Sequence, residues 1–158
     1  MGSKSRTASY TKLIPDTRYG SLLASKFINC LMHDGKKATA TRVFYDAMDQ
    51  IKKRMPDADP IAIFTDALNN VKPTLEVRSR RVGGANYQVP MQVRDKRAQS
   101  LAIRWILAAI RGKSGRPTYL RLAEELMAAY QRQGEAMSKR EQTIKMAEAN
   151  KAFSHFAW

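Results

Sequence analysis

Residues 75–93 have the sequence LEVRSRRVGGANYQVPMQV, and this stretch decides the fold class. Apolar and polar side chains alternate on both sides of Gly83 and Gly84, which is the pattern of two antiparallel strands joined by a tight turn. Glycine supplies the positive φ that such a turn needs. Matching the faces of the two strands favours an odd loop, with Val77 opposite Met91 and residues 83–85 in the turn.

The predicted hairpin has two free edges, so Pro90 is tolerated although it lacks an N–H donor. A two-stranded ribbon is marginally stable by itself in water. We therefore expect a binding partner to order it.

On both sides of the hairpin, apolar residues recur at helical spacing. Three helices are expected before it, over about 22–32, 36–55 and 60–71, and three after it, beginning near 95, 122 and 138. Asp59-Pro60 has the pattern of an N-cap followed by proline at the first helical position. Gly35 and Gly134 suit helix stops, and Ser138-x-x-Glu141 resembles a capping box that opens the last helix.

The expected fold is mainly α: a single domain of about six helices with a protruding two-stranded antiparallel β-hairpin between helices three and four. Residues 1–17 are expected to form a basic N-terminal tail. Residues 18–158 are expected to form one helical RNA-binding domain with a β-arm at about 75–93. Trp105 and Phe153 lie on apolar stripes and are predicted to be core residues.

The 158 residues carry a formal charge of +14, from 28 basic and 14 acidic side chains. The excess is concentrated, because residues 71–116 hold 11 basic and 2 acidic side chains and residues 1–37 hold 7 and 2. The other two segments are nearly balanced. A concentrated excess of this size indicates a polyanionic partner rather than mere solubility, and nucleic acid is the first candidate.

The arginines of the hairpin, Arg78, Arg80 and Arg81, lie on both faces of the predicted ribbon, where Glu76 is the nearest carboxylate. Guanidinium groups hold phosphate oxygens two at a time and stack on bases, which suits RNA. A charged edge that prevents strand aggregation is the structural alternative. Tyr87 is a candidate for stacking on a base, and Phe156 with Trp158 for docking a partner.

Gly35-Lys36-Lys37 is expected to open the second helix, where exposed amides and lysine charge would suit a phosphate. A solvated basic turn is nearly as good an interpretation. A Walker motif is excluded, because the upstream glycine and the Ser or Thr after the lysine are both missing.

Catalysis and cofactor binding lack candidates in the sequence. Cys30 and His33 could share a metal, but two ligands do not make a site, and no carboxylate pair stands out as general acid and base. We expect no enzyme activity, no cofactor and no metal. A single cysteine, the lack of an apolar segment after the basic N-terminus and the lack of a membrane-binding pattern favour the cytoplasm, with no membrane partner.

The chain resembles the family of the seventh protein of the small ribosomal subunit, of bacterial or organellar type, over nearly its whole length. The segments that carry the resemblance are Lys26–Asn29, Asp34–Lys37, Val71–Pro73, Glu76–Gly84, Tyr87–Pro90, Leu101–Trp105, Lys139–Glu141 and Met146–Phe153. The resemblance implies a structural protein that binds the 3′ major domain of small-subunit rRNA and organises the head of the subunit. It also implies a place near the exit-site tRNA and the mRNA exit path, with neighbouring small-subunit proteins as partners, on bacterial or organellar ribosomes.

Combined with the charge pattern, the resemblance gives two sets of candidate residues. Those expected to contact rRNA are Lys4, Arg6, Lys12, Lys36, Lys37, Lys72, Arg78, Arg80, Arg94, Arg97, Arg104, Arg111, Lys113 and Arg116. Those expected at the arm tip near tRNA are Arg81, Gly83, Gly84, Asn86 and Tyr87.

Three other functions remain open from the residues. A DNA-binding architectural protein could insert a proline-bearing arm into the minor groove. A nuclease or RNA-modifying enzyme is a second alternative, although the residues for catalysis are missing. The same RNA surface could also bind the chain's own mRNA.

Overall fold

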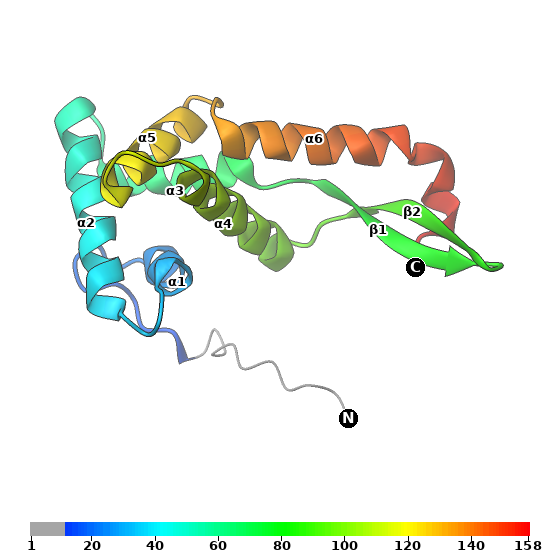
Figure 1. Cartoon of the computed structure of the whole chain (residues 1–158), viewed down its shortest axis with the longest axis horizontal. Helices are drawn as coiled ribbons and strands as arrows, with labels where there is room; N and C mark the ends of the chain where they lie inside the picture. Colours follow the sequence, from blue (N-terminus) through cyan, green and yellow to red (C-terminus); the bar gives the residue numbers. More distant parts are fainter. Residues whose placement is uncertain (1–11) are drawn as a thin grey trace.

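The computed structural model describes residues 12–158. Their elements are α1 (Leu22–Leu31), α2 (Lys37–Arg54), α3 (Pro60–Val71), β1 (Leu75–Val82), β2 (Ala85–Gln92), α4 (Asp95–Gly112), α5 (Thr118–Tyr130), α6 (Glu135–Ala149) and the 3₁₀ helix η2 (Lys151–Phe156). The prediction of a mainly helical fold with a two-stranded antiparallel hairpin between the third and fourth helices is confirmed. Figure 1 shows the hairpin, which we call the arm, extending away from α1 to α5.

Local sequence signals place the first helices. The Ser21 hydroxyl accepts a hydrogen bond from the Ala24 amide at 3.1 Å and caps α1. The Asp59 carboxylate accepts from the Ile61 amide at 3.3 Å, with Pro60 as the first residue of α3. These side chains satisfy amides that a helix start otherwise leaves without a partner, so the predicted cap at Asp59 is confirmed.

Three phenylalanines from three helices form the centre of the core. Phe27 of α1, Phe44 of α2 and Phe64 of α3 are fully buried, and their ring centroids lie 5.1 to 5.9 Å apart. Edge-to-face and tilted contacts at this distance stabilise the core beyond the burial of apolar area. Trp105 of α4 is 9% exposed, which confirms its prediction as a core residue.

The predicted register of the arm is wrong by one residue. Val77 pairs with Pro90 and Glu76 with Met91, and Val82 faces Ala85 across a two-residue turn. Gly83 and Gly84 have φ values of +57° and +84°. Positive φ at both central residues is the geometry of a type I′ turn, whose twist matches that of the strands, so no third loop residue is needed.

The predicted start of the last helix is also wrong, because α6 begins at Glu135 and Ser138 lies inside it. Gly134 is the N-cap of α6 with φ +94°, and it is not the stop of α5, which ends at Tyr130. The start of α6 is capped by a buried side chain of another helix. The Glu125 carboxylate of α5 accepts a hydrogen bond from the Ala136 amide at 3.0 Å. A carboxylate at this end is favoured by the positive charge of the helix N-terminus.

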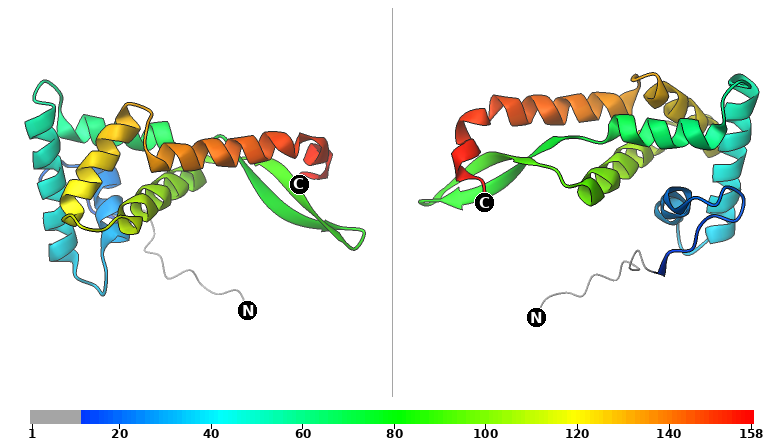
Figure 2. Two further views of the ribbon diagram at one scale, coloured as in Figure 1. Left: turned by 45° about the horizontal axis from the view of Figure 1, so that its top comes forward. Right: turned by 180° about the vertical axis from the view of Figure 1, so that it is seen from behind.

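The arm does not stand alone. α6 runs alongside it, and η2 turns down onto β2 (Figures 1 and 2). The chain itself therefore supports the ribbon, which was expected to need a binding partner for order. Phe153, predicted to be a core residue, is half-buried against the arm and lies outside the helical core.

Within residues 12–158, no helix has the length and apolar character that crossing a bilayer requires. In the same part of the chain, no three His, Cys, Asp or Glu side chains come together as a metal site would require.

Candidate nucleic-acid interface

Glu76 anchors the base of the arm. It is 7% exposed and pairs with Arg78 at 3.0 Å and with Arg97 at 3.2 Å, so it joins β1 to α4. The Nε of Arg97 is buried without a hydrogen-bond partner among the described residues. Arg78 and Arg97, both predicted to contact rRNA, thus have one side fixed within the chain, while about half of the side chain of each remains exposed.

Arg80 and Tyr87 contact the C-terminal segment. Arg80 donates a hydrogen bond to the Phe156 carbonyl and lies 5.0 Å from the centroid of the Trp158 ring. The Tyr87 ring packs on Phe153 and Phe156. These two residues, proposed from sequence for rRNA and for a base, are engaged inside the molecule in this structure.

The opposite face of the arm is open. By the register, Ser79 pairs with Gln88 and Arg81 with Asn86, and all four side chains are exposed. Residues that face each other across a ladder share one face. Arg81 is the cation on this open face, next to the exposed Gly83-Gly84 tip, and it has no ion pair within residues 12–158.

A row of arginines follows α4. Arg97, Arg104 and Arg111 are seven residues apart, which is about two helical turns or ~10 Å, so they share one stripe. Arg104 is exposed and has no ion pair among the described residues. The same holds for Arg94, which lies just before the helix. Arg111 lies within 3.4 Å of the carbonyls of Cys30 and Leu31 at the end of α1.

At its far end, α4 reaches a positively charged cavity of 330 Å³ between α1, α2, α4 and α5. Its basic lining comes from Lys36, Arg111, Arg121 and His33, and no carboxylate lines it. Thr39 near the start of α2 and Thr118 at the start of α5 also line it, so two helix N-termini meet there. Free amides and helix dipoles at N-termini favour anions.

We use the name basic track for Arg94, Arg97, Arg104, Arg111 and Lys36. Because α4 begins at the base of the arm and ends at the cavity, the track joins these two regions along one helix (Figure 1). Lys37 is exposed beside Lys36 as the first residue of α2, as the sequence predicted.

Three of the basic residues that were predicted to contact rRNA form ion pairs with carboxylates of the chain. Lys72 pairs with Asp95 at 3.4 Å, Lys113 with Glu125 at 3.3 Å and Arg116 with Glu124 at 2.5 Å. Lys113 also lies 4.0 Å from Glu135. Exposed pairs of this kind are weak, so Lys72 and Arg116 can exchange their partner for a phosphate, whereas Lys113 compensates a carboxylate that is 2% exposed.

Sequence reasoning missed Arg121 and His33 as lining residues of the cavity. Arg121 donates to the carbonyl of Ile110 at 2.8 Å, to that of Lys113, and to the Thr118 hydroxyl at 2.9 Å, so it also closes the α4–α5 connection. Arg121 lies outside the two basic segments of the sequence, and His33 was considered only as a metal ligand with Cys30. A helical projection of α5, which places Arg121 and Thr118 one turn apart, is the signal that could have identified the arginine.

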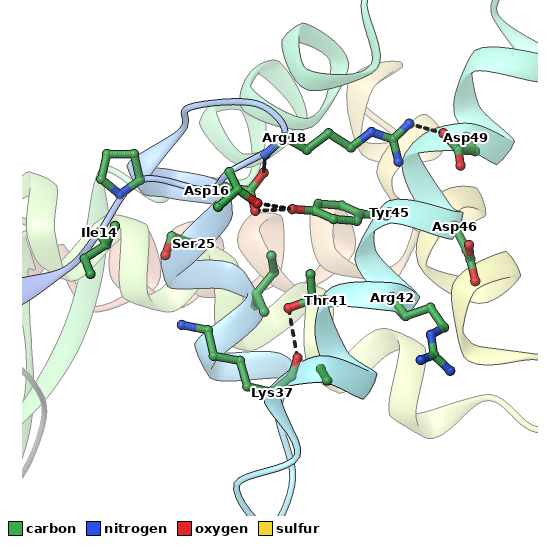
Figure 3. Close-up of a pocket in the computed structure, with 14 residues that line it drawn as sticks. Ile14, Asp16, Arg18, Ser25, Lys37, Thr41, Arg42, Tyr45, Asp46 and Asp49 are labelled. Carbon is green, nitrogen blue, oxygen red and sulfur yellow. Dashed lines mark hydrogen bonds and ion pairs between the residues drawn. The ribbon is translucent and has the colours of Figure 1, made fainter.

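A second pocket, of 730 Å³, lies where the N-terminal segment meets α2 (Figure 3). Asp16 is 9% exposed and accepts hydrogen bonds from the Tyr45 hydroxyl at 2.7 Å and from the amides of Arg18 and Tyr19. Arg18 donates a hydrogen bond to the Asp49 carboxylate, and this bond raises the pKa of the guanidinium.

Asp16, Asp46 and Asp49 balance the cations of this second pocket. It is therefore a tether for the N-terminal segment and a poor site for a phosphate. Lys12 is exposed at the start of the described residues. Lys4 and Arg6, also predicted to contact rRNA, lie outside the described residues.

Comparison with known proteins gives a consistent result. The family model described as ribosomal protein S7p/S5e matches residues 3–151. A small ribosomal subunit protein uS7 from Rhodopirellula baltica is 63% identical over 153 residues, which cover 96% of this chain and 98% of the relative. Proteins of the same name from Rhodospirillum centenum and Thermotoga neapolitana are 52% identical over 156 residues and 53% identical over 153 residues, each with at least 97% of both chains covered.

Proposed function

Since this chain belongs to the ribosomal protein S7p/S5e family, we propose that it binds the 3′ major domain of small-subunit rRNA and organises the head of the subunit. Membership in this family makes the chain a structural, non-enzymatic, RNA-binding constituent of the small ribosomal subunit.

The observation that carries the proposal is the basic track together with the carboxylate-free cavity at its end. Arginines spaced along one helix can contact successive phosphates of a folded RNA. Such contacts fix position and register without reading bases. RNA helices present phosphates and 2′-hydroxyls rather than readable base edges, so recognition by shape fits this surface.

We assign the arm tip, formed by Arg81, Gly83, Gly84 and Asn86, to the neighbourhood of the exit-site tRNA and the mRNA exit path. The support is the distance of the tip from the helical body, which leaves it accessible while the track is occupied (Figure 1). Tyr87 is assigned to this region as well, in the role of a support for the tip, because its ring is covered by Phe153 and Phe156. Neighbouring small-subunit proteins complete the proposed surroundings, on ribosomes in the cytoplasm.

The test is binding to a folded RNA fragment that contains the 3′ major domain. Arg104→Ala should weaken binding roughly 3- to 10-fold, ~1 kcal/mol, and lower the dependence on salt by about one phosphate contact. Lys145→Ala is the matched control, because Lys145 is exposed and belongs to α6, a helix that lies on the opposite side of the molecule from α1 (Figures 1 and 2). Equal losses for both variants, or equal affinity for duplex DNA, would refute the assignment and favour an architectural DNA-binding role.

A further inference from the structure

The far half of the arm is held by the C-terminal segment, residues 151–158. The Tyr87 ring centroid lies 5.2 Å from that of Phe153 and 4.9 Å from that of Phe156. Arg80, opposite Tyr87 in the ladder, donates to the Phe156 carbonyl and lies over the Trp158 ring. One residue from each strand is thus fixed by the same short segment.

These contacts supply packing that a bare ribbon lacks. A two-stranded hairpin needs a further apolar surface to be stable, and aromatic rings at these distances contribute more than the area they bury. Between the base of the arm and α6, by contrast, there is an open groove of 810 Å³ lined by Leu75, Met91, Ala147 and Ser154 among others. The far contact therefore acts together with the Glu76–Arg97 ion pair and the contacts between β1 and α6 in setting the direction of the arm.

The segment is itself held from the core. It follows α6, which spans 15 residues, or about 22 Å, and whose first turn is capped by the buried Glu125. α6 and the arm leave the helical body side by side, and η2 joins the end of α6 to the arm short of its tip (Figures 1 and 2). The result is a closed frame.

We propose that Phe153 and Phe156 are positioning residues for RNA binding: they hold Tyr87 and Arg80, and thereby set where Arg81 and the Gly83-Gly84 tip meet RNA. Their proposed role is to pack against Tyr87 rather than to contact RNA. Within the frame, Arg80 points inward to the C-terminal segment and Arg81 points outward. The RNA part of this inference rests on the proposed function, whereas the frame does not.

The first test is hydrogen exchange of the free protein. Phe153→Ala/Phe156→Ala should speed amide exchange in residues 79–88 and leave α2 and α3 unchanged, since both rings lie outside the helical core. Ser154→Ala, on the same 3₁₀ turn, should exchange like the parent. Restoring aromatic rings with Phe153→Tyr/Phe156→Tyr should restore slow exchange. Unchanged exchange in the arm of the alanine variant would overturn the proposal.

The second test is a double-mutant cycle on the binding of tRNA to the complex of the protein with the 3′ major domain fragment, because the arm tip is assigned to tRNA. Arg81→Ala should weaken tRNA binding when it is the only substitution, and in the Phe153→Ala/Phe156→Ala background its effect on the logarithm of the affinity for tRNA should fall by half or more. Additive losses would mean that the rings do not position Arg81, and would overturn the proposal. If the parent itself fails to bind the fragment, the proposed function fails, and hydrogen exchange still decides whether the frame exists.

Discussion

At the scale of single residues, Lys113 and Arg104 show how one kind of charge serves two purposes. Both are cations from the most basic part of the sequence. Lys113 compensates Glu125, a buried carboxylate that caps α6, whereas Arg104 is exposed without an ion pair in the described part of the chain. The first stabilises the fold, and the second is available to a phosphate.

Lys113→Ala should therefore lower the free energy of unfolding by roughly 1 to 2 kcal/mol, a value reduced from that of a fully buried pair because the lysine side chain is 39% exposed. Urea denaturation measures this loss, with Lys139→Ala as an exposed control expected to change stability little. An unchanged unfolding midpoint combined with a loss of RNA affinity would show that Lys113 serves RNA after all.

Gly134→Ala tests the cap of α6 by placing a methyl group against the Glu125 carboxylate. A Cβ at Gly134 would lie 2.9 Å from Glu125 Oε1 in addition to the strain of φ +94°, while Gly115 has φ +84° with open space around it. Gly115→Ala should cost about 1 kcal/mol from backbone strain, and Gly134→Ala clearly more, on the order of 2 to 3 kcal/mol. Equal costs in chemical denaturation would mean that the contact with Glu125 does not matter.

Tyr19 gives a test in alkaline solution. Burial raises its pKa above the ordinary 10.0, and the nearby Arg18 partly opposes this. The folded chain then keeps the phenolic proton at a pH where the unfolded chain loses it, so stability falls as the pH rises past about 10. Between about pH 9 and pH 10.5, the urea midpoint of the parent should fall more than that of Tyr19→Phe. Equal falls of the urea midpoint in both proteins would show that Tyr19 is not the group responsible.

At the scale of elements, the turn of the arm fixes its register. Gly83→Asn should preserve the hairpin, because asparagine tolerates positive φ at the first position of a type I′ turn, while Gly83→Val should disrupt it. Amide chemical shifts of residues 77–90 and binding to RNA report this directly. A folded arm in the valine variant would mean that the turn does not determine the pairing.

The same elements show what a sequence can predict. The dipeptide Asp59-Pro60 was sufficient to predict the start of α3, because the capping side chain is next to the helix in the sequence. The start of α6 was missed because its cap, Glu125, lies nine residues before Gly134 and reaches the helix only through tertiary packing. The register was missed because face-matching took Val77 and Met91 as partners, while the two glycines close the ladder without a third residue.

At the scale of the whole molecule, the charge pattern shows where basic side chains gather but not which of them pair with carboxylates inside the chain. The excess over residues 71–116 correctly singled out the arm and α4 as basic. The sequence could not predict which basic side chains stay free to bind phosphate, because Lys72 and Lys113 pair with carboxylates that lie 23 and 12 residues away in the sequence. The support of the arm by Phe153 and Phe156 was missed for the same reason, because 66 or more residues separate these rings from Tyr87.

The most direct test of the central claim, that this chain holds ribosomal RNA through phosphate contacts along α4 and the cavity, is the affinity for the folded 3′ major domain fragment across a range of salt concentrations. The logarithm of the binding constant should fall linearly with the logarithm of salt, with a slope on the order of −5 if about six phosphates are neutralised. Arg104→Ala and Lys36→Ala should each make the slope shallower by about one. A flat response, or slopes unchanged in both variants, would contradict the account.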